Sequence, residues 1–233
     1  MARDITICLT SCGRFDLLEK TISSLVTYWD GLPPAEFIIH EDSGKVPQDL
    51  AIDLNRFLAR HWQIQAEWTV SNNKGQINAI DLLYTRVQTP YIFHCEDDWE
   101  FYQSGFVSDS RSVLKHDSSI YTVWLRHPGD RNGHPVLAGV RRTLNDVRFQ
   151  EMATNYRKLW HGMTWNPGLR RLSDYKMAGH FSEFCNWDFK DQIRAEIQFN
   201  DHYRKLGFQA ASLCRGFVKH IGYHNSLKKH QTK

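Results

Sequence analysis

Hydrophobic and polar positions follow two spacings in the first half of the chain. Short apolar runs with the composition of buried strands occupy residues 4–10, 37–40, 65–70 and 91–95. Between them, apolar residues recur every three or four positions, which predicts amphipathic helices. These helical stretches cover residues 15–29, 47–61 and about 76–87, the last preceded by the capping sequence Asn72-Asn73-Lys74-Gly75. Strands that alternate with helices predict a mostly parallel, doubly wound α/β sheet with right-handed crossovers.

The second half of the chain has a less regular pattern. Helices are predicted at residues 106–114 and 193–206, and strands at residues 120–125 and 208–213. Residues 141–156 have no clear period, and residues 160–168 are aromatic and rich in turn formers. The aromatic stretch suits either an acceptor pocket or a second small core. We expect one domain over residues 1–226 and a disordered basic tail at residues 227–233.

The fourth predicted strand runs directly into a cluster of carboxylates. Three consecutive acids, Glu96-Asp97-Asp98, follow the strand and lead into Trp99-Glu100-Phe101. Adjacent carboxylates raise one another's pKa unless a positive charge lies among them, and Mg²⁺ or Mn²⁺ is the usual remedy. Open α/β sheets bind ligands at the carboxyl ends of their strands. A solvated acidic turn is the alternative, but the apolar strand before the acids and the aromatic residues after them favour a metal site.

The first two predicted strands also end in polar turns. Ser11-Cys12-Gly13-Arg14 follows the first strand and could present backbone N–H groups and Arg14 to a diphosphate, or form only a tight turn. Glu41-Asp42-Ser43-Gly44 follows the second strand. Its carboxylates could bind a ribose or a base, or the segment could be an ordinary Asp-Ser-Gly turn.

Composition narrows the class of protein. The chain has 233 residues, 41% hydrophobic and 24% charged, as in ordinary globular proteins, and its net charge of +3 does not argue for nucleic acid. Five cysteines form no CxxC pair and the first residues lack a signal-peptide core, so we expect a reducing, cytoplasmic location. No run approaches the ~18 apolar residues of a membrane span, which leaves peripheral membrane or partner-subunit contact open.

Several of these segments recur together in one family. They are the opening strand and turn over residues 6–14, the acids after the second strand, Asn73-Lys74-Gly75 before a helix, and the strand that ends in Glu96-Asp97-Asp98. Together they resemble the GT-A-fold glycosyltransferases of the family-2 type. The resemblance implies a Rossmann-like sheet flanked by helices, with residues 1–101 binding a nucleotide-sugar and the smaller portion at residues 102–226 binding the acceptor.

The resemblance also implies a donor and metal site. The acids after the fourth strand match the family's DxD motif, with Glu96 in place of its first Asp. Asp98 is expected to bind Mn²⁺ or Mg²⁺, completed by His220 or His224. The residues expected to bind the UDP- or GDP-linked sugar are Thr10, Ser11, Arg14, Asp42, Gly75, Glu96 and Asp97.

Acceptor chemistry is assigned in the same way. Glu196 lies in the first turn of the helix predicted at residues 193–206 and matches the position of the family's catalytic base. Asp191 and Glu183 are the next candidates. Trp99 and Trp165 are expected to contact the acceptor, which could be a glycan, a lipid-linked molecule or a protein, because Trp rings are good platforms for sugars.

The predicted activity is metal-dependent transfer of a sugar, of the hexosyltransferase type, from a nucleotide-diphosphate donor to a hydroxyl group, with inversion. A nucleotidyltransferase is the nearest alternative, but it would need a more glycine-rich first loop than Ser11-Cys12-Gly13-Arg14. A non-catalytic carbohydrate-binding protein could use the tryptophans, but it would have no need of three adjacent acids.

Overall fold

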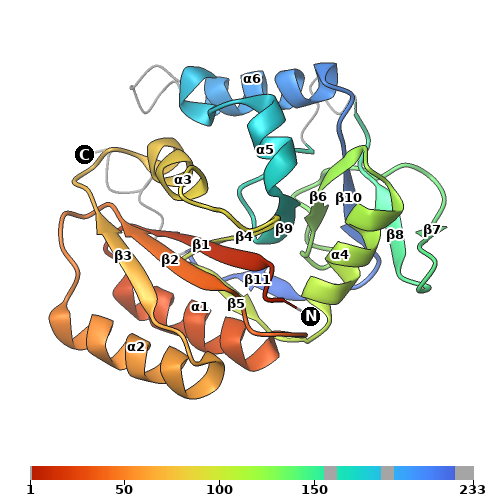
Figure 1. Cartoon of the computed structure of the whole chain (residues 1–233). Coiled ribbons are helices and arrows are strands. Elements are labelled where there is room, and N and C mark those ends of the chain that lie inside the picture. The colour runs from red at the N-terminus through yellow and green to blue at the C-terminus, as the bar shows by residue number, and fades with distance from the viewer. Residues whose placement is uncertain (1, 155–161, 185–191, 224–233) are drawn as a thin grey trace.

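A central sheet built mainly from the first half of the chain organises the fold (Figure 1). The computed structural model describes residues 2–154, 162–184 and 192–223. Four strands pair in parallel: β1 (Ile5–Ser11), β2 (Glu36–Glu41), β3 (Ala66–Val70) and β4 (Tyr91–Glu96). Strand β9 (Gly168–Arg171) joins β4 in the antiparallel direction, so the order is β3-β2-β1-β4-β9. The predicted parallel sheet is confirmed.

Helices cover both faces of this sheet (Figure 1). They are α1 (Phe15–Tyr28) and α2 (Gln48–Trp62) on one face and α3 (Gln76–Tyr84) on the other. The reason is the alternation of side chains along each strand. In β1, Ile7 and Leu9 pack in the same cluster as Leu18 of α1, whereas Cys8 packs in the cluster that contains Ile80 of α3. The predicted helices are confirmed, although α3 ends at Tyr84 and its N-terminus has no side-chain cap.

The second half of the chain adds a smaller sheet with the order β6-β10-β8-β7. Its elements and their neighbours are α4 (Phe106–His116), β6 (Ile120–Trp124), β7 (Arg141–Arg142), β8 (Arg148–Glu151), α5 (Leu172–Ala178), the 3₁₀ helix η2 (Phe181–Phe184), α6 (Gln192–Lys205) and β10 (Gln209–Leu213). The predicted helices and strands of this half are present. Strands β7 and β8 lie where the sequence showed no period, because two and four residues are too few to display one.

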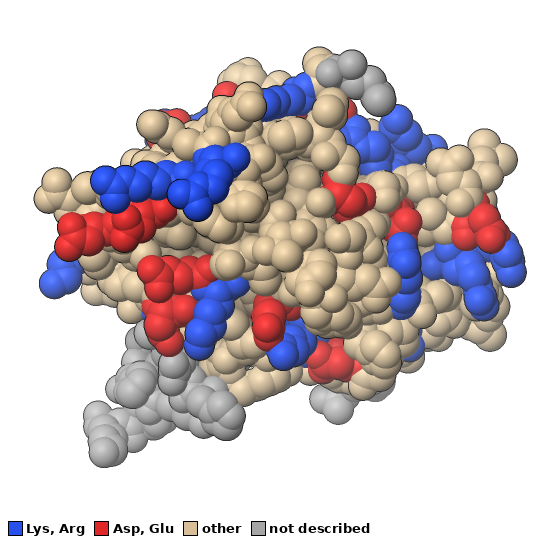
Figure 2. Space-filling model, turned by 90° about the horizontal axis from the view of Figure 1, so that it is seen from below, with Lys and Arg blue, Asp and Glu red and all other residues tan. Residues whose placement is uncertain are grey.

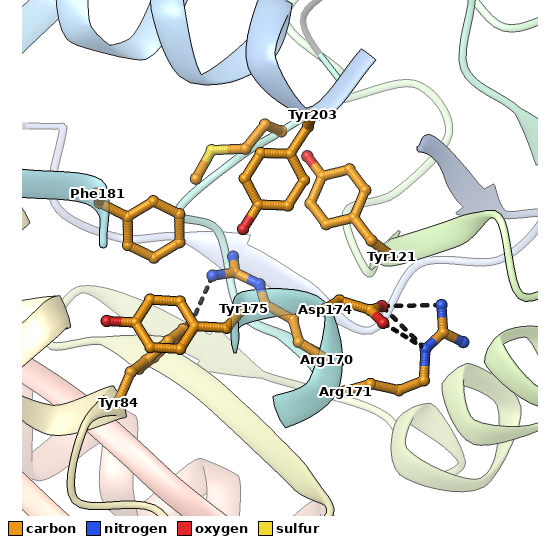
Figure 3. A pocket seen from close by; sticks show the side chains of 9 residues that line it. Tyr84, Tyr121, Arg170, Arg171, Asp174, Tyr175, Phe181 and Tyr203 are labelled. Atoms are coloured by element: carbon orange, nitrogen blue, oxygen red, sulfur yellow. Dashed lines mark hydrogen bonds and ion pairs between the residues drawn. The ribbon is translucent and has the colours of Figure 1, made fainter. Parts of the chain in front are cut away.

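Arg170 of β9 lies at the centre of a buried aromatic cluster (Figure 3). Its guanidinium donates to the Tyr84 hydroxyl at 2.6 Å and to the carbonyl oxygen of Thr164, and the rings of Tyr175 and Phe181 lie 5.3 Å apart beside it. The cavity among these side chains is about 10 Å³, room for one water at most. Met163 and Trp165 of the aromatic stretch pack in the same cluster as these aromatic residues, so the described part of that stretch contributes to a second small core, one of the two alternatives.

Charged side chains of both signs lie beside one another on the face shown in Figure 2. Within the described ranges, no helix has the length and apolar composition needed to cross a bilayer.

His94 gives the fold a dependence on pH. Its side chain on β4 is fully buried, with ring centroids 5.8 Å from Tyr84 and 6.1 Å from Trp165. Burial, with the charge of Arg170 nearby, holds the pKa of His94 well below its ordinary value of 6.5. The unfolded chain therefore binds a proton below about pH 6.5 that the native protein does not, so native stability is full above that pH and falls as the pH decreases.

We expect this effect to disappear in a His94→Leu variant. Between about pH 6 and 5, the free energy of unfolding of the wild type should fall by about 1.2 kcal/mol more than that of the variant. Urea unfolding curves at several pH values measure the difference, and parallel pH dependences of the two proteins contradict the prediction.

Candidate active site

The carboxyl ends of β1, β2 and β4 bring the predicted acids together. Ser11 pairs in register with Glu41 of β2, and Thr10 pairs with Glu96 of β4. A short antiparallel ladder of β5 (Trp99–Phe101) and β11 (Val218–His220) carries His220 to the same edge. Residues from four separate segments of the sequence therefore lie at one end of the sheet, three of them at the carboxyl ends of parallel strands.

Asp97 is an anchor for the turn after β1. It is fully buried, and its Oδ2 accepts hydrogen bonds from Ser11 Oγ at 3.1 Å and Cys12 N at 3.2 Å. Arg14 donates to both of its carboxylate oxygens. Burial raises the pKa of Asp97 to about 6, against the opposing effect of Arg14. With both oxygens bonded, this carboxylate fixes the turn and places Arg14.

Asp98 has one carboxylate oxygen without a hydrogen-bond partner in the described residues, here called its open oxygen. Its Oδ2 lies 2.6 Å from Arg14 Nη1 and 3.1 Å from His220 Nε2, whereas its buried Oδ1 has no partner among the described residues. Burial alone would raise the pKa of Asp98, but the hydrogen bond with His220 and the charge of Arg14 hold it below its usual range. Asp98 is therefore an ionised carboxylate with one open oxygen, which suits a metal ligand.

Gly222 makes room for Asp98, a role that sequence reasoning missed. A Cβ atom at residue 222 would lie 2.9 Å from Asp98 Cγ, closer than side chains tolerate. The neighbouring Ile221 N donates to the Asp98 carbonyl oxygen at 2.8 Å. The backbone after β11 therefore passes directly over the acid, which requires glycine. A Gly two residues after a candidate metal ligand was the available signal.

Glu96 and Trp99 form a pair beside Asp98. The indole Nε1 of Trp99 donates to Glu96 Oε2 at 3.1 Å, and Gln76 donates to Glu96 Oε1. Loss of hydration and then repulsion from Asp98 raise the pKa of Glu96 to about 8, so it is mostly protonated at pH 7. Such a carboxyl group can donate as well as accept a hydrogen bond, so it can pair with a ribose or sugar hydroxyl in either direction.

Neither tryptophan assigned to the acceptor presents an open ring. Trp99 is 1% exposed, with the Arg126 guanidinium 5.2 Å from its ring centroid and the His220 ring 5.0 Å away. Trp165 is half-buried and packs edge-on against Phe181 at 4.8 Å. The structure shows Trp99 supporting Glu96 and His220, and acceptor contact by either ring stays a prediction.

Glu41 and Asp42 at the end of β2 face different ways. Glu41 Oε1 accepts from Gly13 N and Ser43 N, both at 2.8 Å, while its Oε2 is buried without a partner in the described chain. Asp42 accepts from Lys74 N at 2.8 Å and Gly75 N at 2.7 Å. Asp42 therefore satisfies the backbone before α3, in place of the predicted asparagine cap. Its contact with the donor stays a prediction, and Glu41 has the freer oxygen.

Replacing Asp42 with Ala tests this arrangement. Two backbone N–H groups would lose their acceptor, so the free energy of unfolding should fall by about 2–4 kcal/mol. Nucleoside diphosphate affinity should fall by about 1–3 kcal/mol because the turn that carries Gly75 loosens. Chemical denaturation and calorimetry measure the two effects, with Asp53→Ala on the exposed face of α2 as the control. If the free energy of unfolding and the nucleotide affinity both equal those of the wild type, Asp42 has no role in the site.

Other predicted residues lie wholly or partly outside the described chain. His224, Asp191 and the side chain of Glu196 are among these. Helix α6 begins at Gln192, so Glu196 is its fifth residue, and the prediction that Glu196 lies in the first turn was wrong. Glu183 lies in η2 with an exposed side chain.

Of the residues predicted to bind the metal, the structure brings Asp98 and His220 together. No group of three or more His, Cys, Asp or Glu side chains among the described residues is arranged to hold a metal. A pair of protein ligands is nevertheless sufficient where substrate phosphates and water complete the coordination, as is common for Mg²⁺. The open oxygen of Asp98 beside an imidazole fits such a site.

Comparison with known proteins identifies the fold. No family model and no curated protein matches the sequence. Among solved structures, S. aureus TarS superposes with a TM-score of 0.61 at 10% identity, covering 92% of this chain and 36% of TarS. GalNAc-T7 in a crystal with UDP, GalNAc and Mn²⁺ gives 0.61 at 13% identity, covering 93% and 43%. Residues 1–349 of TarS with UDP give 0.59 at 10% identity, covering 92% and 59%.

These matches place the chain in a structural class. TarS and GalNAc-T7 are GT-A glycosyltransferases, and this chain has the GT-A fold. The likeness at 10% to 13% identity establishes the fold alone. The chain spans between 36% and 59% of the length of these structures.

Proposed function

We propose that this chain is a glycosyltransferase that uses Mn²⁺ or Mg²⁺ to transfer a sugar from a nucleotide-diphosphate donor to a hydroxyl acceptor, with inversion. The observation that carries the proposal is the open, buried oxygen of Asp98 beside His220, at the carboxyl end of β4 in a GT-A fold. This is the place where such sheets bind ligands.

The residues of the donor site have distinct roles in this proposal. Asp98 and His220 would hold the cation, which supplies positive charge to the leaving diphosphate when bound. The N–H groups of Cys12 and Gly13 already donate to Asp97 and Glu41, so the turn itself has few donors left for phosphate. Arg14 is the group of this turn with charge to offer the diphosphate.

Glu196 is the proposed general base for the acceptor. As a general base, its carboxylate would take the proton from the attacking hydroxyl group, on the face of the sugar opposite the diphosphate. Attack from that face inverts the anomeric centre. UDP is present in the crystals of GalNAc-T7 and TarS, which supports a UDP-linked sugar as the first donor to test.

A thermal-shift screen tests the proposal directly. UDP, GDP and the corresponding triphosphates are compared with Mn²⁺ and with EDTA. One nucleoside diphosphate should raise the melting temperature by several degrees only when Mn²⁺ is present, because ligands of the native state stabilise it. A preference for triphosphates would favour a nucleotidyltransferase, and no response to any nucleotide would contradict the proposal.

A further inference from the structure

Arg14 binds both aspartates of the acidic cluster. Its Nε donates to Asp97 Oδ2 at 3.2 Å and its Nη2 to Asp97 Oδ1, while its Nη1 donates to Asp98 Oδ2 at 2.6 Å. The arginine side chain is 19% exposed. One guanidinium therefore bridges two carboxylates and offsets only part of their charge, at the point where the proposed donor site needs a divalent cation.

The two aspartates differ in how many hydrogen bonds hold their carboxylates. Asp97 also accepts hydrogen bonds from Ser11 Oγ and Cys12 N, so both of its oxygens have partners, Arg14 included. The two hydrogen bonds from Arg14 to Asp97 therefore belong to a fully paired network. Asp98 receives a single bond from Arg14, keeps a second partner in His220, and has one open oxygen. The bond between Arg14 and Asp98 is the one that can break without dismantling the turn.

We propose that Arg14 is a counter-ion that competes with the divalent cation for Asp98. When cation and donor both bind, one N–H group of Arg14 stops donating to Asp98 and donates to the diphosphate of the donor instead. This inference rests on the proposed function and gives Arg14 a second role in it, as a competitor of the cation for Asp98. Arginine suits the role because its planar group has five donors, so that two can stay on Asp97 while a third changes partner.

The consequence is a coupling between metal and nucleotide. Like charges repel, so a guanidinium within hydrogen-bond distance of Asp98 weakens binding of a divalent cation to that carboxylate. A diphosphate offers the guanidinium another anionic partner and so removes the competition. Each ligand must then raise the affinity of the other by the same factor. The cation would bind weakly alone and tightly with the donor.

Titration of MnCl₂ followed by electron paramagnetic resonance tests this without any turnover. The wild type, Arg14→Gln and the control Arg215→Gln are titrated alone and with saturating UDP or GDP. Arg215 is a suitable control because it is 52% exposed, pairs with Asp109 and loses the same charge. Arg14→Gln should bind Mn²⁺ alone about 10-fold or more tightly than the wild type, and its gain from nucleotide should shrink correspondingly. Arg215→Gln should match the wild type.

The outcomes separate this inference from the proposed function. If nucleotide tightens Mn²⁺ binding to the wild type but Arg14→Gln binds Mn²⁺ as weakly as the wild type does, only the role of Arg14 is overturned and the proposed function stands. Absence of any nucleotide effect on Mn²⁺ binding to the wild type overturns the proposed donor site and this inference with it. If Arg14→Gln does not fold, Arg14→Lys decides: it keeps the charge but not the fork, so a nucleotide gain equal to that of the wild type overturns the inference.

Discussion

The Asp98→Asn variant is expected to remain folded and to lose the part of nucleotide binding that depends on Mn²⁺. The open Oδ1 of Asp98 is the oxygen that a cation would take, and an amide oxygen carries no charge to hold it. Mutation of outer-shell partners typically lowers metal affinity 10–100-fold, so loss of the ligand itself should lower it by about 100-fold or more. The free energy of unfolding should fall by only about 1–2 kcal/mol, because the weakened bonds with Arg14 and His220 are partly offset by relief of repulsion from Asp97.

Calorimetric titration of nucleotide with Mn²⁺ and with EDTA measures this loss. The matched control is Asp109→Asn, which removes the same charge from a carboxylate bonded to Arg215 and leaves the acidic cluster intact. The control should keep the full gain from Mn²⁺. An Asp98→Asn variant that keeps that gain would show that another group holds the cation, and His220 would then need a different partner.

The strands and helices of residues 1–101 could be predicted because each shows a strong period. β1 to β4 are apolar runs, and α1 to α3 repeat apolar residues at helical spacing. Their alternation also predicts that the strands are parallel, and parallel strands place their carboxyl ends at one edge. For this reason Glu41, Asp42 and the acids after β4 could be brought together from the sequence alone.

The directions of individual side chains could not be predicted. Asp42 and Trp99 were chosen for chemistry that needs exposure, but Asp42 bonds the backbone before α3 and Trp99 is buried under Arg126. Both outcomes depend on residues more than 25 positions away, which no local pattern reveals. The bridge that Arg14 makes between Asp97 and Asp98 has the same origin, since a guanidinium finds its partners only after the strands have paired.

The Glu196→Gln variant is expected to turn over about 10²–10⁴-fold more slowly than the wild type, the usual contribution of a general base. Glutamine keeps the shape of the side chain but cannot accept the proton of the acceptor hydroxyl group. Nucleotide binding in the presence of Mn²⁺ should be unchanged, because the base acts on the acceptor and not on the diphosphate. Initial rates of donor consumption per folded molecule, with nucleotide affinity measured in parallel, give the two quantities.

A merely stabilising role for Glu196 makes different predictions. A carboxylate in the first turn of a helix is stabilised by the helix dipole, an effect worth about 0.3–1 kcal/mol that fades beyond that turn. Helix α6 has no acid in its first turn, and Glu196 is the fifth residue from Gln192. Its loss should therefore hardly change the melting temperature, so a large fall in turnover cannot come from unfolding. Glu67→Gln, which alters an exposed acid of β3 that pairs with Arg86, serves as the control. Turnover of Glu196→Gln within a few-fold of the wild type would exclude Glu196 as the base and make Asp191 and Glu183 the residues to change next.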